Sequence, residues 1–215
     1  KEQLGGTVTV VSMGPPQADV ALREALAMGC DEAYLVSARE FGGSDTYATS
    51  GIIAAALKKI GYDLIITGRQ AIDGDTAQVG PQIAEKLHLP QVSYVEEVVE
   101  AAADHVVVKR QFEDGYHIIK IKTPCLLTAI AELATPRYMS VRGIVEAYEK
   151  EIKVLGFEDL KDGLELDMIG LKGSPTNVYQ SFTKEVKGAG TILEGLSADE
   201  AVKAIMDKLE AKFII

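Results

Sequence analysis

The first ninety residues alternate short apolar runs with amphipathic stretches. Runs rich in β-branched and aliphatic residues predict buried strands at 7–12, 32–37 and 63–67. Helical spacing of apolar residues predicts helices at 19–28, 46–60 and 76–87. This strand–helix alternation with short connections predicts an α/β fold, with a parallel, doubly wound (Rossmann-like) sheet and helices on its faces.

The pattern changes after Pro90. The stretches 105–112 and 116–121 flank Glu113-Asp114-Gly115, which predicts an added antiparallel hairpin. A further apolar strand is expected at 125–130, and a charged helix at 136–151 after an irregular start.

The C-terminal third has weak periodicity from 152 to 189 and a clear helix at 197–212, where Ser197 and Glu200 have capping-box spacing. We therefore divide the chain into a nucleotide-binding α/β domain, 1–151, and a C-terminal arm with its terminal helix, 152–215, that packs on a partner subunit. At the other end, residues 1–6 have the composition of a helix end with a glycine stop, and we expect a further element upstream.

Composition narrows the function classes. The net charge of −10 argues against a nucleic-acid-binding protein. No apolar run reaches the roughly 18 residues of a membrane helix, which favours a cytoplasmic setting. Cys30 and Cys125 stand far apart without a metal-binding pattern, so we expect reduced core residues and no metal site.

Three glycine-containing loops follow the three predicted strands, at 13–16, 41–45 and 68–75. Ligands of open parallel sheets bind beyond the carboxyl ends of the strands, where these loops meet. The loop at 41–46 has a glycine pair, but Ser44 or Asp45 as a helix cap explains most of its composition.

The stretch 68–81 (GRQAIDGDTAQVGP) is the most informative of the three. Gly68 ends a strand, Gly74 permits an unusual backbone angle, and Asp75 or Thr76 can cap the next helix. The first free N–H groups, at 77–79, favour an anion, while Asp73 and Asp75 suit capping or ribose hydroxyls. Phosphate binding is the prediction, and an ordinary polar crossover is the alternative. The chain has no GxxxxGK[ST] and no GxGxxG after a strand, which argues against a P-loop or a standard dehydrogenase domain.

Catalytic chemistry of the chain's own is not indicated. His88, His105 and His117 are scattered, and no nucleophile–base or acid pair follows from spacing, so any catalysis depends on a cofactor. The stretch 136–144 places arginines among apolar residues, which fits a contact patch or a solvated loop equally well.

The run DLIITGRQAIDGDTAQVGPQIAEKLHLPQV, at 63–92, resembles the signature of electron transfer flavoprotein β subunits. VTVVSMGPP at 8–16, ALAMGCDEAYLVS at 25–37 and TPRYMSVRGI at 135–144 extend the resemblance over essentially the whole chain. Family members begin with a further strand and loop.

The resemblance implies a heterodimer with an α subunit that carries FAD. Simple electron carriers of this family hold a structural AMP in the β subunit, with Asn-Gln-Thr-Gly at the helix start. Here 77–81 is Ala-Gln-Val-Gly-Pro, which, with the GGSDT loop, resembles the electron-bifurcating branch. In that branch the β subunit binds a second FAD and takes hydride from NADH. One electron passes to ferredoxin or flavodoxin, and the other passes through the α-subunit FAD to an acyl-CoA dehydrogenase.

The resemblance also implies site residues. Met13 and Gly14 are expected near the adenosine, and the ribose and pyrophosphate near Gly68, Arg69, Gln70, Asp73, Gly74, Asp75, Thr76, Ala77, Gln78 and Val79. NADH is expected near Gly42, Gly43, Asp45 and Thr46. Partner recognition is expected at Arg137, Tyr138, Met139, Ser140, Val141, Arg142 and Ile144, where Val141 replaces the usual Leu anchor.

Two alternatives stay open. One is a non-bifurcating electron transfer flavoprotein with AMP in the β subunit. The other is a stand-alone nucleotide-sensing domain, which predicts a homo-oligomer without flavin.

Overall fold

The computed structural model describes residues 1–215 except 3, 184, 185 and 187. The chain divides into two compact units, Lys1–Asn177 and Val178–Ile215. The first unit therefore continues past the predicted boundary at residue 151, because the residues that follow form part of its sheet and core.

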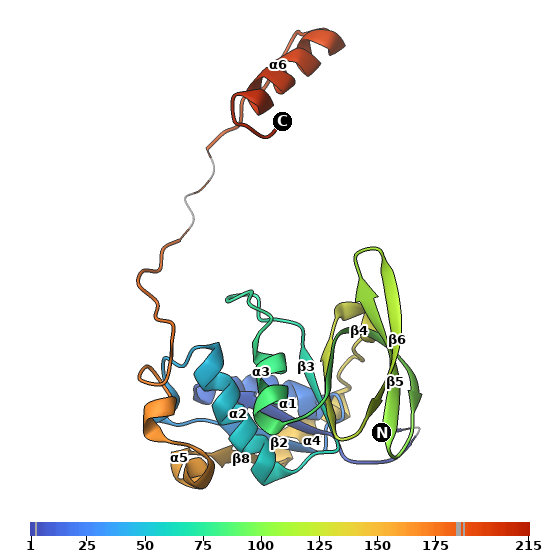
Figure 1. Ribbon diagram of the computed structural model, residues 1–215, viewed down its shortest axis with the longest axis vertical. Helices are drawn as coiled ribbons and strands as arrows, with labels where there is room; N and C mark the ends of the chain where they lie inside the picture. Colours follow the sequence, from blue (N-terminus) through green and yellow to red (C-terminus); the bar gives the residue numbers. More distant parts are fainter. Residues whose placement is uncertain (3, 184–185, 187) are drawn as a thin grey trace. The chain divides into compact units, whose positions relative to one another are not determined.

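The first unit contains two sheets (Figure 1). In the first, β1 (Thr9–Met13), β2 (Glu32–Val36) and β8 (Ile152–Leu155) are all parallel, in the order β1-β2-β8. In the second, β3 (Leu64–Gly68), β7 (Cys125–Ala129) and β4 (Gln91–Ala101) are parallel. The antiparallel strands β5 (His105–Phe112) and β6 (Gly115–Lys122) extend it to the order β3-β7-β4-β5-β6. The predicted α/β class, parallel strands and hairpin are confirmed.

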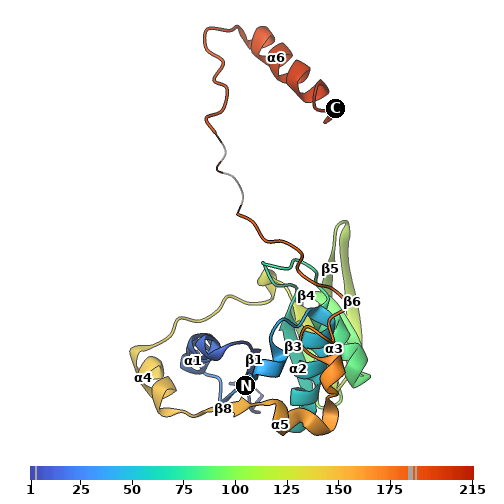
Figure 2. The ribbon, with the colours of Figure 1, turned by 90° about the vertical axis from the view of Figure 1, so that its left-hand side faces the viewer.

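Helices cover both faces of the first sheet (Figure 2). Leu35 packs with Leu22 of α1 (Asp19–Ala27) and Ala147 of α4 (Val141–Glu149). The next residue, Val36, points the other way and packs with Ile52 of α2 (Thr46–Ile60) and Leu160 of α5 (Phe157–Leu160). This alternation explains why the strand is apolar on both faces.

The second sheet continues the same core. Leu126 of β7 packs with α2 and with Ile83 of α3 (Val79–Leu87), while its neighbour Leu127 packs with Val108 on the opposite face. Val11 of β1 contacts the clusters of both sheets, so α2 and the apolar side chains beneath it join them. Cys125 is free and fully buried in this core, and burial raises the pKa of its thiol, which disfavours the reactive thiolate. Cys30 is also free and is half-buried.

Short 3₁₀ helices interrupt the connections of the first unit at Pro16–Ala18, Arg39–Phe41, Ala131–Leu133, Lys161–Gly163 and Leu166–Met168. In the second unit, α6 (Ala198–Glu210) has the predicted capping box, since Ser197 Oγ accepts from Glu200 N and the Glu200 carboxylate accepts from Ser197 N. Among the described residues, none of the helices is long and apolar enough to cross a membrane.

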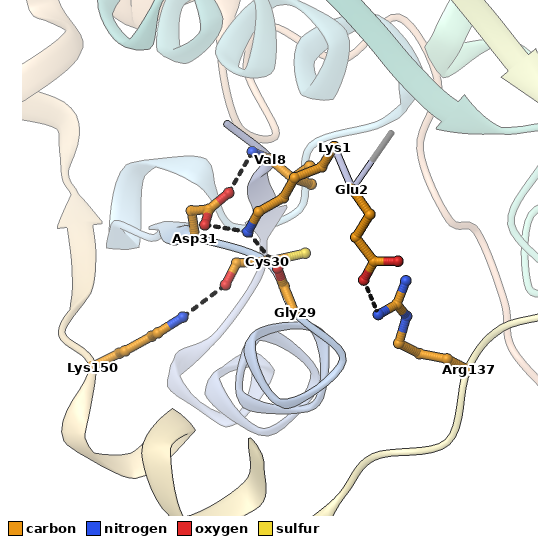
Figure 3. Close-up of polar contacts among 8 residues, drawn as sticks. All are labelled: Lys1, Glu2, Val8, Gly29, Cys30, Asp31, Arg137 and Lys150. Atoms are coloured by element: carbon orange, nitrogen blue, oxygen red, sulfur yellow. Dashed lines mark hydrogen bonds and ion pairs between the residues drawn. The ribbon is translucent and has the colours of Figure 1, made fainter. Parts of the chain in front are cut away.

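The N-terminal residues were predicted as a helix end, and Gln3 of that stretch lies outside the described residues. Gly5 N donates to Lys1 O at 2.8 Å, and Gly5 has a φ of 80°, in the left-handed region. The Lys1 ammonium binds the carboxylate of Asp31, which also accepts from Val8 N at 2.9 Å (Figure 3). These bonds, with that of Lys1 the strongest, lower the pKa of Asp31.

Candidate functional site

A pocket of about 610 Å³ opens at the carboxyl ends of β1 and β2. Pockets of this size hold small molecules or parts of cofactors in many proteins. Its wall is mainly apolar, and it is lined by Met13, Gly14, Pro15, Pro16, Val36, Ser37, Ala38, Arg39, Phe41, Gly42, Gly43, Ser44 and Thr49. The pocket thus brings together two of the three predicted loops, 13–16 and 41–45. The third loop is not part of its lining.

Asp45 directly follows the pocket-lining residues Gly42, Gly43 and Ser44. Its Oδ1 accepts from Tyr47 N at 2.9 Å and from Ala48 N at 3.1 Å, so Asp45 rather than Ser44 caps α2. Burial by itself would raise the pKa of this carboxyl, but hydrogen bonds from Ala48 N, Thr176 and Tyr47 N outweigh it and lower the pKa. Asp45 therefore carries a stable negative charge at the edge of the loop.

The predicted phosphate loop is largely exposed and irregular. It leaves β3 at Gly68, and α3 begins only at Val79, three residues later than predicted. Asp75 and Ala77 have φ values of 51° and 53°, a left-handed backbone that a helix cannot continue through. The predicted cap by Asp75 or Thr76 is therefore wrong, since Gln78 is the N-cap residue and makes no capping bond with its side chain.

Gly74 permits an unusual backbone angle, but the free chain does not use that freedom. Its φ lies outside the left-handed region, and a Cβ added there meets nothing within 4 Å. Within the stretch 68–81, the glycine with no room for a side chain is Gly80, where an added Cβ would lie 2.6 Å from Thr67 Oγ1 and 2.8 Å from Thr128 Cγ2. The sequence did not indicate Gly80, because the requirement for glycine there comes from side chains of the neighbouring strands and not from an unusual backbone angle of its own.

The start of α3 still offers free amides. Gln82 N is bonded to Gln78 O at 2.9 Å, so the N–H groups of Val79 and Gly80 precede the first helical bond, and Pro81 has none. Thr46 Oγ1 donates to Gln78 Oε1 at 2.8 Å and links this helix start to that of α2. The two helices thus present their N-termini side by side, which favours a negatively charged ligand.

Arg69 lies near the ring of Tyr94, a residue that the sequence did not indicate as part of the site. Its Cζ lies 5.8 Å from the centroid of the Tyr94 ring, and Arg110 Cζ lies 6.0 Å from the same centroid. Tyr94 has a φ of 59° within an irregular stretch of β4, and its N–H donates to Thr128 Oγ1 at 3.2 Å. Arg110 Nε is buried without a hydrogen-bond partner among the described residues. The strand β4 was not predicted, so its tyrosine could not be placed.

The predicted partner segment forms an exposed ridge. Tyr138 and Val141 are 99% and 81% exposed, and Met139 and Ile144 are exposed with them. Ser140 caps α4 by accepting from Gly143 N at 3.0 Å. The helix that carries the ridge packs closely on α1, since a Cβ added at Gly143 would lie only 2.5 Å from Ala27 O.

The two arginines of this ridge are both paired within the chain. Arg142 Nε donates to Glu146 Oε1 at 2.5 Å, one helical turn away. Arg137 Nη1 donates to Glu2 Oε1 at 2.5 Å, and this bond lowers the pKa of Glu2 (Figure 3). The ridge therefore presents exposed apolar side chains together with arginines whose charges are balanced by glutamates of the same chain.

These features define a doubly wound α/β protein with a pocket for a small ligand at the carboxyl edge of its parallel strands. Residues 1–160 match the family described as electron transfer flavoprotein domain. The chain therefore belongs to the electron transfer flavoprotein family, as a β subunit.

Relatives within the family are close. The acryloyl-CoA reductase electron transfer subunit gamma of Anaerotignum propionicum is 55% identical over 221 residues, which cover 100% of this chain and 82% of that protein. The electron transfer flavoprotein subunit beta of Thermoanaerobacterium thermosaccharolyticum is 54% identical, with the same coverage. The caffeyl-CoA reductase-Etf complex subunit CarD of Acetobacterium woodii is 51% identical over 100% of this chain and 81% of that protein.

Proposed function

We propose that this β subunit binds FAD, pairs with an α subunit that carries another FAD, and takes part in NADH-driven electron bifurcation to an acyl-CoA dehydrogenase. The observation that carries the proposal is the pocket that joins Met13-Gly14 to the Gly42-Gly43 loop, together with the bond from Thr46 to Gln78 that ties the following helix to the start of α3. Close relatives in an acryloyl-CoA reductase and a caffeyl-CoA reductase complex support the choice of acceptor class.

The residues fit a flavin nucleotide in three ways. The apolar wall at Met13, Val36 and Phe41 suits a flat ring system. The amides of Val79 and Gly80 suit a pyrophosphate, and the chain needs no lysine there. The exposed loop from Arg69 to Gln78 would cover the ribose, and the carboxylate of Asp73 or Asp75 would accept hydrogen bonds from the ribose hydroxyl groups.

The bound flavin would supply the redox chemistry, and the chain would supply position. Each NADH would give up a hydride, which carries two electrons, and become NAD⁺. One electron would reduce ferredoxin or flavodoxin and the other would reach the dehydrogenase by way of the α subunit, while the proton would go to solvent. Two NADH molecules therefore supply the two electrons that reduce one acyl-CoA double bond. Gly42, Gly43 and Thr46 would face the incoming nicotinamide nucleotide.

Two surfaces would bind protein partners. The ridge around Val141 would dock the dehydrogenase, because an exposed apolar patch on a rigid helix is typical of an interface. The second unit would pack on the α subunit, since Val202, Ile205 and Met206 of α6 leave apolar side chains exposed.

The test is a count of nucleotides extracted from the purified α/β complex. Two FAD per heterodimer are expected. One FAD and one AMP would refute the bifurcation proposal and establish the simple electron carrier instead. A homo-oligomer without flavin would point to a stand-alone nucleotide sensor.

A further inference from the structure

The segment 170–176 lies against the loop that lines the pocket. Ser174 Oγ accepts a hydrogen bond from Asp45 N at 2.8 Å. The Ser174 hydroxyl in turn lies within donating distance of Gly170 O, at 2.6 Å, and of Gly43 O, at 3.4 Å. Gly170 N donates to Ser44 Oγ at 3.1 Å. Loop and segment are more than 120 residues apart in sequence, so the bonds that join Gly43, Ser44 and Asp45 to the segment are tertiary, and the bond from Ser174 to Gly170 is local to the segment.

The two carboxylate oxygens of Asp45 accept hydrogen bonds from two different parts of the chain, the start of α2 and the segment 170–176. One oxygen, Oδ1, caps α2. The other, Oδ2, accepts from Thr176 N at 3.0 Å and from Thr176 Oγ1 at 2.8 Å. A single side chain therefore holds the helix that starts at the pocket and the segment that packs behind the loop. Hydrogen bonds to a charged acceptor are among the stronger ones in proteins.

Two glycines bring the surfaces into close contact. A Cβ at Gly43, whose φ is 74°, would lie 2.6 Å from Leu171 Cγ. A Cβ at Gly170, whose φ is 59°, would lie 2.4 Å from Glu40 O. Both residues need a backbone that other residues rarely adopt, and both contacts leave no room for a side chain. The loop conformation and the docked segment therefore depend on each other.

We propose that Asp45 and the segment 170–176 position the Gly42–Ser44 wall of the pocket, so that ligand occupancy and docking of this segment are thermodynamically coupled. The nucleotide as ligand rests on the proposed function, but the positioning of the loop does not. Coupling is reciprocal: a ligand that contacts the held loop stabilises the segment, and the docked segment raises the affinity for the ligand. The segment leads directly into the second unit, which begins at Val178.

The deciding variant is Asp45→Asn in the α/β complex. Asparagine is a good N-cap residue, so its Oδ1 keeps the cap on α2. Its amide nitrogen cannot accept from Thr176 N–H, so the backbone docking bond is lost, and the Thr176 hydroxyl can only accept from that nitrogen instead of donating to a charged oxygen. Thr176→Val is the second variant, since it removes the 2.8 Å bond and keeps the backbone bond. Thr123→Val, which removes a hydroxyl bond to Ala103 O remote from the pocket, is the control.

Two measurements apply to all variants: amide hydrogen exchange without nucleotide, and the dissociation constants of AMP and of FAD. We expect faster exchange at 42–44 and 170–176 in both test variants. Affinity for whichever nucleotide the wild-type complex binds should fall on the order of tenfold. Nucleotide should slow exchange at 170–176 in the wild type, which a merely structural contact would not produce.

The inference is overturned if exchange at 42–44 is unchanged in Asp45→Asn, or if this variant binds nucleotide as the wild type does. If the wild-type complex binds neither AMP nor FAD, the proposed function fails by itself. Exchange at 42–44 in the ligand-free variants then still decides whether the segment positions the loop.

Discussion

Thr46 and Gln78 join the starts of two helices, since Thr46 Oγ1 donates to Gln78 Oε1 at 2.8 Å. The contact links the glycine-pair loop to the predicted phosphate loop, which the sequence could only place at the same sheet edge.

Thr46→Val should therefore weaken nucleotide binding more than folding. Gln78 is exposed and Thr46 is half-buried, so loss of their bond should change the free energy of unfolding by about 1 kcal/mol or less. Release of Gln78 should lower nucleotide affinity several-fold, as measured by titration of the α/β complex. Thr7→Val, at an exposed threonine, is the control, and equal affinities in the two variants would contradict the prediction.

Gly80→Ala should destabilise the fold by about 1–3 kcal/mol, because the added methyl group overpacks the contact with Thr67 and Thr128. The higher helix propensity of alanine offsets up to about 1 kcal/mol of this. Urea unfolding measures the difference. Gly51→Ala in α2, where the nearest atoms are the flexible end of Lys86 at 3.7 Å, should not be destabilising.

Gly74→Val should leave folding intact and reduce retention of the nucleotide. The free chain has space for the side chain there, so the free energy of unfolding should stay within about 0.5 kcal/mol of wild type. A branched side chain would nevertheless keep the loop backbone away from a phosphate. Full nucleotide occupancy in the folded variant would show that this loop does not approach the ligand.

Val141→Asp should impair electron transfer to the dehydrogenase and leave reduction by NADH unchanged. The side chain is 81% exposed in the free chain, so the substitution should not disturb folding. A charge at the centre of an apolar interface is costly to bury. Val20→Asp on α1, also at an exposed valine, should retain transfer. Equal loss in both variants would mean that the ridge is not the docking surface.

Acid should weaken the contact made by Asp45. The pKa of its carboxyl is lowered in the folded chain, so the unfolded chain binds the proton more readily. The contribution of Asp45 to stability is then full above the ordinary aspartate pKa and is lost as the pH falls through that value toward the folded one. Urea unfolding between pH 7 and pH 3 should show a smaller pH-dependent loss for Asp45→Asn than for wild type. Parallel curves would exclude this role of the charge.

Local patterns predicted much of the fold. The apolar runs, the Glu113-Asp114-Gly115 turn and the Ser197–Glu200 capping box each depend on residues close in sequence, and the structure has strands, a hairpin and a helix there. The four-residue strand β8 was missed because its strand character comes from pairing with β2. The late start of α3 was missed because the left-handed backbone of Asp75 and Ala77 leaves no mark in the residue types.

For this protein, the sequence by itself determined the α/β class, the family, and the two loops, 13–16 and 41–45, that line the pocket. Only the tertiary structure decided which side chains act together. Asp45 is a helix cap by its neighbours in sequence, yet its second oxygen holds Thr176. Arg69 approaches Tyr94 from a different strand, and Gly80 is required by Thr67 and Thr128. The physical reason is that capping and periodicity are set within a turn or two of chain, whereas these contacts depend on where distant segments meet in space.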